Sequence, residues 1–210
     1  MDNNQKISIC LGRQLGSGGS EIARFLAKEL GFTFYDKEII CAAAAKSGYS
    51  TDIFEEKDEE KSDLHTFFSN LIPFVGSADF YGNHVDEDAL FRILSETIQS
   101  IAAEENCIFV GRCAEYILRN RRDTMMSVFV CADDEDRIAR LCEARNIKPN
   151  AARKLIATND KRRAAFHDFY SNHQWGYAST YDLCINQSRL GLENTKHFIL
   201  DYIRQRFDLR

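Results

Sequence analysis

Short apolar runs alternate with amphipathic stretches along most of the chain. Several of the runs are apolar without alternation, which is typical of strands that are buried on both faces of a parallel sheet. Five runs predict β-strands, at residues 7–11, 32–35, 107–111, 126–132 and 182–186. Helical periodicity fills most of the intervals between them, over residues 22–30, 87–105, 134–146 and 192–207. This alternation of strands and helices predicts an α/β sandwich around a parallel sheet.

One interval departs from this rhythm. Residues 37–85 contain no convincing strand, so we predict a helical insertion between the second and third strands. Its acidic part, residues 52–63, carries interspersed lysines and lacks the spacing of metal ligands. We therefore interpret that part as a solvated helix face rather than as a metal site.

Composition narrows the class of protein. The 210 residues suffice for one substantial core, and 44% of them are hydrophobic. The net charge of −5 predicts no nucleic-acid partner, so a phosphate site must be a local cluster of basic residues. No apolar run approaches the ~20 residues that span a bilayer, so no membrane association is expected. The polar N-terminal segment MDNNQK predicts no secretory signal.

The cysteines and histidines indicate no metal site. The number of cysteines, 7, is odd, there is no CxxC pair, and several cysteines lie in or beside apolar runs. Reduced, buried cysteines in a cytoplasmic protein are therefore expected. The histidines lack ligand spacing, and we expect each to be structural or exposed rather than catalytic. They are His65, His84, His167, His173 and His197.

The segment GRQLGSGGSE, residues 12–21, joins the first predicted strand to the first predicted helix. A glycine-rich turn in this position lets backbone N–H groups converge on an anion, and the helix N-terminus adds partial positive charge. Glycines also permit positive φ angles and close approach of phosphate oxygens. The alternative is a tight turn without a ligand. The residues of the predicted phosphate-binding loop are Gly16, Ser17, Gly18, Gly19 and Ser20.

The lysine that such loops usually carry is absent. In the register GxxxxGK[ST], Gly18 is the last motif glycine, Gly19 takes the lysine position and Arg13 takes the first glycine position. A hydrogen bond to a charged group contributes roughly 1.5–3 kcal/mol, so nucleotide binding weakens unless another cation replaces the lysine. Arg13 is the candidate replacement, and Ser20 is the candidate for contact with Mg²⁺.

Several segments, in order, resemble the cytidylate kinase-like family of P-loop proteins. They are GRQLGSGGSEIARFLAKELG, FYDKEII, IFVGRCAEYIL, NDKRRAAFHDFY and YDLCINQSRLGLE, and they span nearly the whole chain. The resembled branch reads GSGG where true cytidylate kinases read GSGK. The resemblance implies a three-layer sandwich with a five-stranded parallel sheet, of the P-loop nucleoside monophosphate kinase type. It also implies ATP and Mg²⁺ as cofactors, and a small-molecule acceptor nucleotide, with CMP or dCMP leading.

The resemblance assigns acceptor-binding roles to residues after the second and third strands. Asp36 would face the acceptor nucleotide, and the insertion at residues 37–85 would bind it. Arg112 would grip its phosphate, because a guanidinium matches phosphate geometry bidentately. The alternatives are a helix N-cap for Asp36 and a surface ion pair for Arg112. Cys113 stands where the GRD motif of cytidylate kinases has its aspartate.

A basic cluster near residue 160 matches the lid of such kinases. Lys161, Arg162 and Arg163 would close on the phosphates from a lid segment at residues 150–178, with the two arginines catalytic and the lysine binding substrate. Phosphoryl transfer needs positive charge around the transferring group and exclusion of water. The alternative is a solvated basic helix face.

Two functions follow, from different classes. The first is ATP-dependent phosphoryl transfer to a nucleoside monophosphate, which Arg112 and the lid arginines favour. The second is a non-catalytic sensor of nucleotides or phosphate on the same scaffold, which Gly19, Ser20 and Cys113 favour. A third interpretation, an oligomeric scaffold protein, requires large exposed apolar patches.

Overall fold

The computed structural model describes residues 5–36 and 87–209, so the predicted insertion at residues 37–85 lies outside the described residues. The described strands form one five-stranded sheet in the order β2-β3-β1-β4-β5, and all neighbouring strands are parallel. This confirms the predicted α/β fold with a five-stranded parallel sheet. The strands are Ser8–Arg13 (β1), Thr33–Tyr35 (β2), Cys107–Val110 (β3), Met125–Cys131 (β4) and Leu183–Asn186 (β5).

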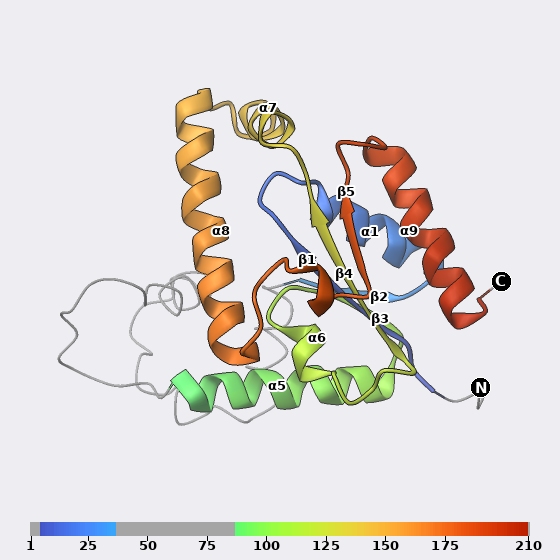
Figure 1. Cartoon of the computed structure of the whole chain (residues 1–210). Coiled ribbons are helices and arrows are strands. Elements are labelled where there is room, and N and C mark those ends of the chain that lie inside the picture. Colours follow the sequence, from blue (N-terminus) through green and yellow to red (C-terminus); the bar gives the residue numbers. More distant parts are fainter. Residues whose placement is uncertain (1–4, 37–86, 210) are drawn as a thin grey trace, which may run out of the picture.

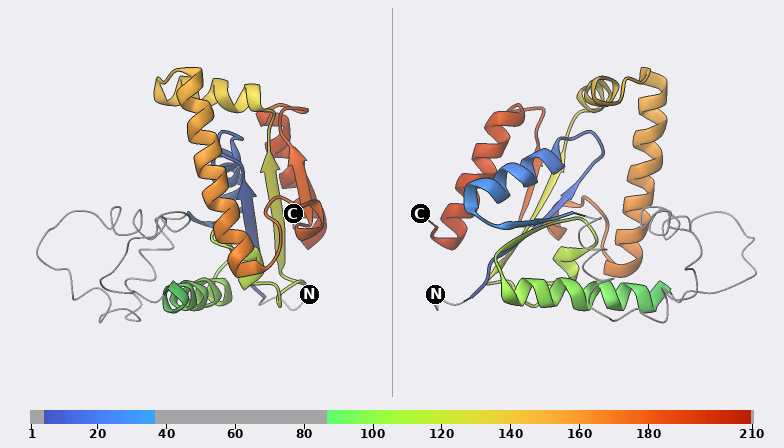
Figure 2. Two further views of the ribbon diagram at one scale, coloured as in Figure 1. Left: turned by 60° about the vertical axis from the view of Figure 1, so that its left-hand side comes forward. Right: turned by 180° about the vertical axis from the view of Figure 1, so that it is seen from behind.

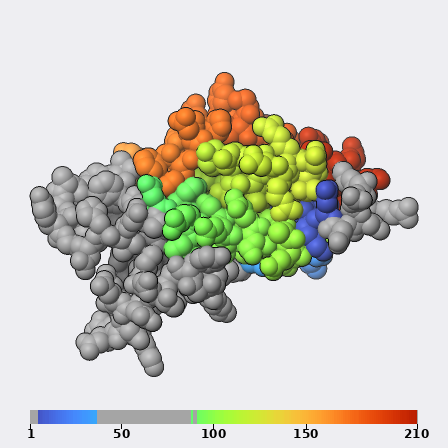
Figure 3. All heavy atoms as spheres, turned by 90° about the horizontal axis from the view of Figure 1, so that it is seen from below, coloured from blue at the N-terminus to red at the C-terminus, as the bar shows by residue number. Residues whose placement is uncertain are grey.

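Helices cover both faces of this sheet (Figures 1 and 2). One face carries α1 and α9, and the other carries α5 and the short α6. A space-filling view from below shows α5 and the segment that contains α6 as one continuous face, with the C-terminal part of α8 beside it (Figure 3). The described helices are Gly19–Leu30 (α1), Glu87–Glu104 (α5), Ala114–Ile117 (α6), Asp134–Arg145 (α7), Pro149–Ser171 (α8) and Leu192–Phe207 (α9), with a 3₁₀ turn at Ala178–Thr180 (η2). None of these helices is long and apolar enough to cross a membrane.

The central strand β1 explains why the apolar runs do not alternate. Ile9 and Leu11 lie in the cluster shared with α1 and α9, whereas Cys10 lies with Phe109 in the cluster shared with α5 and α6. All four side chains are at most 1% exposed. Successive strand residues point to opposite faces, so a strand covered on both sides must be apolar throughout.

A third, smaller cluster lies between α7 and α8. Ile138 and Leu141 of α7 pack with Ala152 and Ile156 of α8, and Leu15 of the loop after β1 packs against them. Helix α8 stands to one side of the sheet, away from α9 (Figure 1). The loop after β1 is therefore attached both to the sheet and to the helix that the sequence predicted as a lid.

The end of α1 and the start of α7 are formed in different ways. Gly31 ends α1 with φ 66° and donates its N–H to the carbonyls of the last turn, as expected of a glycine in this position. Asp133 precedes α7, but its carboxylate does not cap that helix. It accepts hydrogen bonds from Asn186 Nδ2 at 2.8 Å and Arg189 Nη2 at 2.9 Å, so it joins α7 to the segment after β5.

Candidate functional site

The glycine loop connects the end of β1 to the start of α1. Gly16 and Gly18 have φ of 81° and 77°, which residues with a Cβ adopt only with strain. Ser17 is fully buried and its hydroxyl donates to the Gln14 carbonyl oxygen at 2.9 Å, so this side chain shapes the loop. Ser20 is exposed in the first turn of α1. The loop therefore presents backbone N–H groups and a helix N-terminus, the groups that bind phosphate.

The Arg13 side chain runs from this loop to the turn after β3. A Cβ atom added to Gly19 would lie 2.5 Å from the Cβ of Arg13. A Cβ atom added to Gly111 would lie 2.4 Å from Arg13 Nη1. Both glycines thus make room for one arginine, whose guanidinium lies at Gly111. The strands make this possible, because β1 and β3 are parallel neighbours whose carboxyl ends share an edge.

The turn after β3 is strained at two residues that are not glycine. Gly111, Arg112 and Cys113 have φ of 81°, 59° and 54° in succession. The left-handed conformation costs roughly 1–2 kcal/mol for each non-glycine residue. The Arg112 guanidinium lies 5.4 Å from the centre of the Phe166 ring of α8. Its buried Nε has no hydrogen-bond partner among the residues that the structure describes.

Cys113 turns inward at the same place. Its side chain is 3% exposed, and burial, with the Glu115 charge, raises the pKa of the thiol. The thiol is therefore neutral and does not supply the negative charge of the aspartate that cytidylate kinases have here.

Helix α8 contributes one arginine to the loop. Arg163 Nη1 donates to the Arg13 carbonyl oxygen at 3.1 Å. Burial lowers the pKa of Arg163, although the neighbouring Asp160 opposes this. An arginine guanidinium stays charged near neutral pH. Lys161 and Arg162 are exposed, and neither forms an ion pair within residues 5–36 and 87–209. Of the predicted lid cations, the structure brings Arg163 to the loop.

Comparison with known proteins decides the family. The model of the cytidylate kinase-like family matches residues 8–189. The chain belongs to the cytidylate kinase-like family. This confirms the resemblance that the ordered segments indicated.

Solved structures share the fold of this chain. An uncharacterized protein from Eubacterium ventriosum is 26% identical, with a TM-score of 0.71, over 98% of this chain and 100% of that chain. The shikimate kinase from Bacteroides thetaiotaomicron is 14% identical, with a TM-score of 0.50, over 97% of this chain and 99% of that chain, and shows the shared fold. None of the curated proteins compared with the chain matches it. A cytidylate kinase-like chain with this fold is of the class that carries out nucleotide-dependent phosphoryl transfer.

A buried arginine that no sequence motif indicated holds the glycine loop of this cytidylate kinase-like protein. Arg137 of α7 is 4% exposed and donates from Nε to the Leu15 carbonyl oxygen at 2.8 Å. It also pairs with Asp160 of α8 and, at 3.0 Å, with Asp134. Asp160 in turn accepts the Leu15 N–H at 2.8 Å. The backbone of Leu15 is thus held on both sides by one ion pair, in which Arg137 is buried and Asp160 is partly buried.

The sequence carried one signal for Arg137. It lies four residues before Leu141 and next to Ile138, so it stands on the apolar stripe of α7 where a charged residue is out of place. A charge at a buried position needs a partner, and Asp160 is the partner that the fold supplies.

A further cation of α7 lies beside the start of α1. Arg140 Nη1 lies 3.8 Å from Glu21 Oε2, and a Cβ atom added to Gly18 would lie 3.5 Å from the Arg140 guanidinium. Glu21 also pairs with Lys196 of α9 at 2.8 Å. The glycine loop is therefore surrounded by cations from β1, α7 and α8.

Asp36 is the remaining residue that the resemblance assigned. It follows β2 directly, and its carboxylate lies 3.4 Å from Arg24 Nη2 on the exposed side of α1. The helix that it would cap lies outside the described residues. Its role toward an acceptor stays a prediction.

Proposed function

We propose that the protein transfers the γ-phosphoryl group of ATP to a nucleoside monophosphate, with CMP or dCMP as the leading acceptor. The observation that supports this best is the path of Arg13. Its side chain extends from the glycine loop to Gly111, and Arg163 donates to its carbonyl oxygen. Arg112 follows Gly111 directly. Three arginines from separate segments are thus gathered near one edge of the sheet, and phosphoryl transfer requires positive charge around the transferring group.

The lysine position supports the same proposal. A lysine at position 19 would place its Cβ 2.5 Å from the Cβ of Arg13, an atom that cannot move without the backbone. The arginine at the first motif glycine and the glycine at the lysine position are therefore a matched pair. We infer that Arg13 supplies the charge that the lysine supplies elsewhere.

Each part of the site has a proposed task. Backbone N–H groups of residues 16–20 hold the phosphates of ATP, Arg112 holds the acceptor phosphate, and Arg163 neutralises charge that develops during transfer. The residues present fit a polyphosphate, since cations and N–H groups surround the loop. The described residues hold no cluster of three or more metal-ligating side chains. Mg²⁺ would therefore arrive bound to the nucleotide, with the Ser20 hydroxyl as its protein ligand.

One observation favours the alternative, a sensor of nucleotides without catalysis. Cys113 is a buried neutral thiol at the position of the family's aspartate. A protein that binds ATP without an acceptor would not need that aspartate.

A turnover assay separates the two. The purified protein is supplied with ATP and Mg²⁺ and a panel of monophosphates, and ADP and the new diphosphate are measured. The kinase proposal expects acceptor-dependent turnover that falls steeply in Arg112→Ala. Arg122→Ala is the matched control, because Arg122 is exposed in the segment that leads into β4, at the opposite edge of the sheet. Tight ATP binding without turnover on any acceptor would establish the sensor instead.

A further inference from the structure

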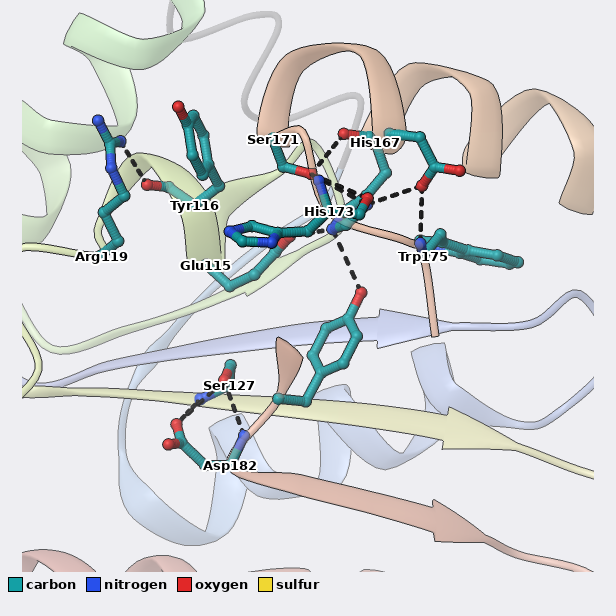
Figure 4. A network of polar contacts seen from close by, with 11 residues as sticks. Glu115, Tyr116, Arg119, Ser127, His167, Ser171, His173, Trp175 and Asp182 are labelled. Atoms are coloured by element: carbon teal, nitrogen blue, oxygen red, sulfur yellow. Dashed lines mark hydrogen bonds and ion pairs between the residues drawn. The ribbon is translucent and has the colours of Figure 1, made fainter. Parts of the chain in front are cut away.

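His167 of α8 lies in a buried polar network beneath the site (Figure 4). Its Nε2 atom lies 2.9 Å from Glu115 Oε1 of α6. Its Nδ1 atom lies 3.1 Å from the His173 carbonyl oxygen and 3.2 Å from Asp168 Oδ1. The Ser171 hydroxyl also lies 3.2 Å from Nδ1. Oxygen atoms therefore face both ring nitrogens, and on each side one of them belongs to a carboxylate. A ring that donates from both nitrogens is the charged imidazolium.

The charges around the His167 ring also favour the imidazolium. Burial lowers the pKa of His167, but the hydrogen bond and charge of Glu115, followed by those of Asp168, outweigh it, so the pKa is raised from 6.5. The other titratable group against the ring is Tyr181, whose hydroxyl lies 3.5 Å from Nε2. Burial and the Glu115 charge raise the pKa of Tyr181, and burial raises that of the nearby Cys113. Both stay neutral, so Glu115 and Asp168 are the charges that the imidazolium meets.

The ion pair of His167 with Glu115 connects α8, which carries Arg163, to the turn after β3, which carries Arg112. Glu115 is the third residue after Arg112, at the start of the short helix that follows the strained turn. His167 is four residues after Arg163, one turn further along the same face of α8. Phe166, between them, contacts the Arg112 guanidinium. Helix α8 thus touches the glycine loop through Arg163 and the Arg112 turn through Phe166 and His167.

We propose that His167 is a positioning residue, whose ion pair with Glu115 fixes α8 to the Arg112 turn and so holds Arg112 and Arg163 at one site. The consequence for turnover rests on the proposed function, whereas the attachment of α8 to the turn does not. The proton strengthens the attachment, because it lets Nε2 donate to Glu115 while Nδ1 donates to the acceptors at the end of α8, and because it gives the ring the charge that attracts both carboxylates. A neutral ring has one donor and cannot satisfy both Glu115 and the acceptors at the end of α8. The attachment therefore weakens as the pH rises through the pKa of His167.

The first test uses the unmodified protein. Histidine side chains are labelled with ¹³C, and their resonances are followed by NMR from about pH 5 to about pH 9. The His167 signal is assigned by its loss in His167→Gln. We expect it to titrate above 6.5, and to titrate at lower pH in Glu115→Gln. The matched control is the signal of His197, which is exposed on α9 and which Glu115→Gln should leave unchanged. A His167 midpoint at or below 6.5, or one that Glu115→Gln leaves unchanged, overturns the proposal.

The second test measures attachment of the helix. Backbone hydrogen exchange of residues 163–171 is compared below and above the measured pKa of His167, after correction for the intrinsic pH dependence. We expect at least tenfold less protection above the pKa, with α1 and α9 unchanged. Glu115→Gln should show the weaker protection at every pH. Equal protection on both sides of the pKa would overturn the proposal, even where a variant fails to fold.

The single tryptophan offers a rapid version of this test. The Trp175 backbone N–H donates to Asp168 Oδ1 at 2.7 Å, and the Trp175 ring packs edge-on against the Phe129 ring, with 5.1 Å between the ring centres. Its fluorescence should therefore follow the same titration in the wild type and lose that step in His167→Gln. Persistence of the step in this variant would contradict the assignment.

Turnover distinguishes this proposal from the proposed function. If the wild type turns over ATP and CMP, His167→Gln should lower kcat more than it raises the KM for ATP, and the fall in activity with rising pH should disappear. Unchanged kcat, with the pH profile retained, would overturn the positioning role. If the wild type does not turn over, the proposed function fails, and the NMR and exchange measurements still decide the attachment.

Discussion

The loop after β1 and the turn after β3 both bring an arginine to the same edge of the sheet, but they are built in opposite ways. The loop takes its positive φ angles at Gly16 and Gly18, where they cost little. The turn takes them at Arg112 and Cys113, at roughly 1–2 kcal/mol each. The loop can adopt many backbone conformations at little cost, so contacts must select one of them. The turn has an unfavourable backbone conformation, so contacts must offset its strain.

Their supports differ accordingly. The loop is held at its backbone, where Arg137 and Asp160 bind both polar groups of Leu15. The turn is held through side chains that follow it, with Glu115 paired to His167. Both supports come from α8 and its neighbours, so one helix stabilises both halves of the site. Substitutions in the two supports should therefore separate the loop from the turn.

The largest effect is expected from Asp160→Ala. It leaves the buried Arg137 with only the exposed carboxylate of Asp134, and it leaves the Leu15 N–H without its acceptor. Breaking a buried pair by removing one partner costs about 3–5 kcal/mol, so the free energy of unfolding in urea should fall by about that amount. Asp136→Ala is the control, because Asp136 is exposed on α7 and unpaired within the described part of the chain. A loss under about 1 kcal/mol would show that the loop does not depend on this pair.

An exchange of residues tests the loop's charge. Arg13→Ala should weaken binding of a non-hydrolysable ATP analogue by about ten- to a hundredfold, since a hydrogen bond to a charge contributes roughly 1.5–3 kcal/mol. Gly19→Lys alone should also weaken binding, because its Cβ meets that of Arg13. Arg13→Gly combined with Gly19→Lys restores the usual motif and should recover most of the affinity by calorimetry. A single Gly19→Lys variant that binds as well as the double variant would refute the matched pair.

The strain in the turn predicts a smaller effect on stability, in which glycine is more stabilising than alanine at position 112, the reverse of the usual order. Glycine tolerates the φ of 59° at position 112 and alanine does not, so Arg112→Gly should be more stable than Arg112→Ala by about 1 kcal/mol. On the exposed face of α7 the order should invert, with Glu143→Ala more stable than Glu143→Gly by about 0.5–1 kcal/mol. Both pairs are compared by urea unfolding. Equal stability of the two variants at position 112 would mean that the turn is not strained.

The pH dependence of stability should show the smallest effect. The pKa of His167 is raised in the folded protein, so its contribution to the free energy of unfolding is complete below about 6.5 and is lost as the pH rises through the folded pKa. Unfolding in urea at about pH 6 and about pH 8.5 should reveal this loss in the wild type and not in His167→Gln. His197→Gln, the exposed control, should keep it. A wild type that gains stability over this range relative to His167→Gln would contradict the raised pKa.

Some of the site could be predicted because its signal is local. The glycines of residues 16–19 follow an apolar run directly, and Arg112 follows the next central strand, so chain order alone brings both to the carboxyl edge. The lid arginines could be predicted as a group but not individually. Adjacent residues of a helix point in different directions, and only packing against the loop selects Arg163 over the exposed Lys161 and Arg162.

The histidines show the limit of a local signal. We expected each of them to be structural or exposed rather than catalytic. His167 is buried, at 4% exposed, and lies in a polar network. Its partner Glu115 lies more than fifty residues away, in a turn whose neighbours give no periodic hint of it. Nothing in the spacing of histidines and acids distinguishes this pair from the others.

The sequence by itself determined the order of strands and helices, the glycine loop and the family, because hydrophobic periodicity and glycine placement act between residues that are close along the chain. The tertiary structure alone decided which charges are buried, which arginines meet, and that two residues which are not glycine take left-handed backbone angles. Those outcomes depend on the free energy of a charge away from water, and that free energy is set by partners that only the folded chain brings within reach.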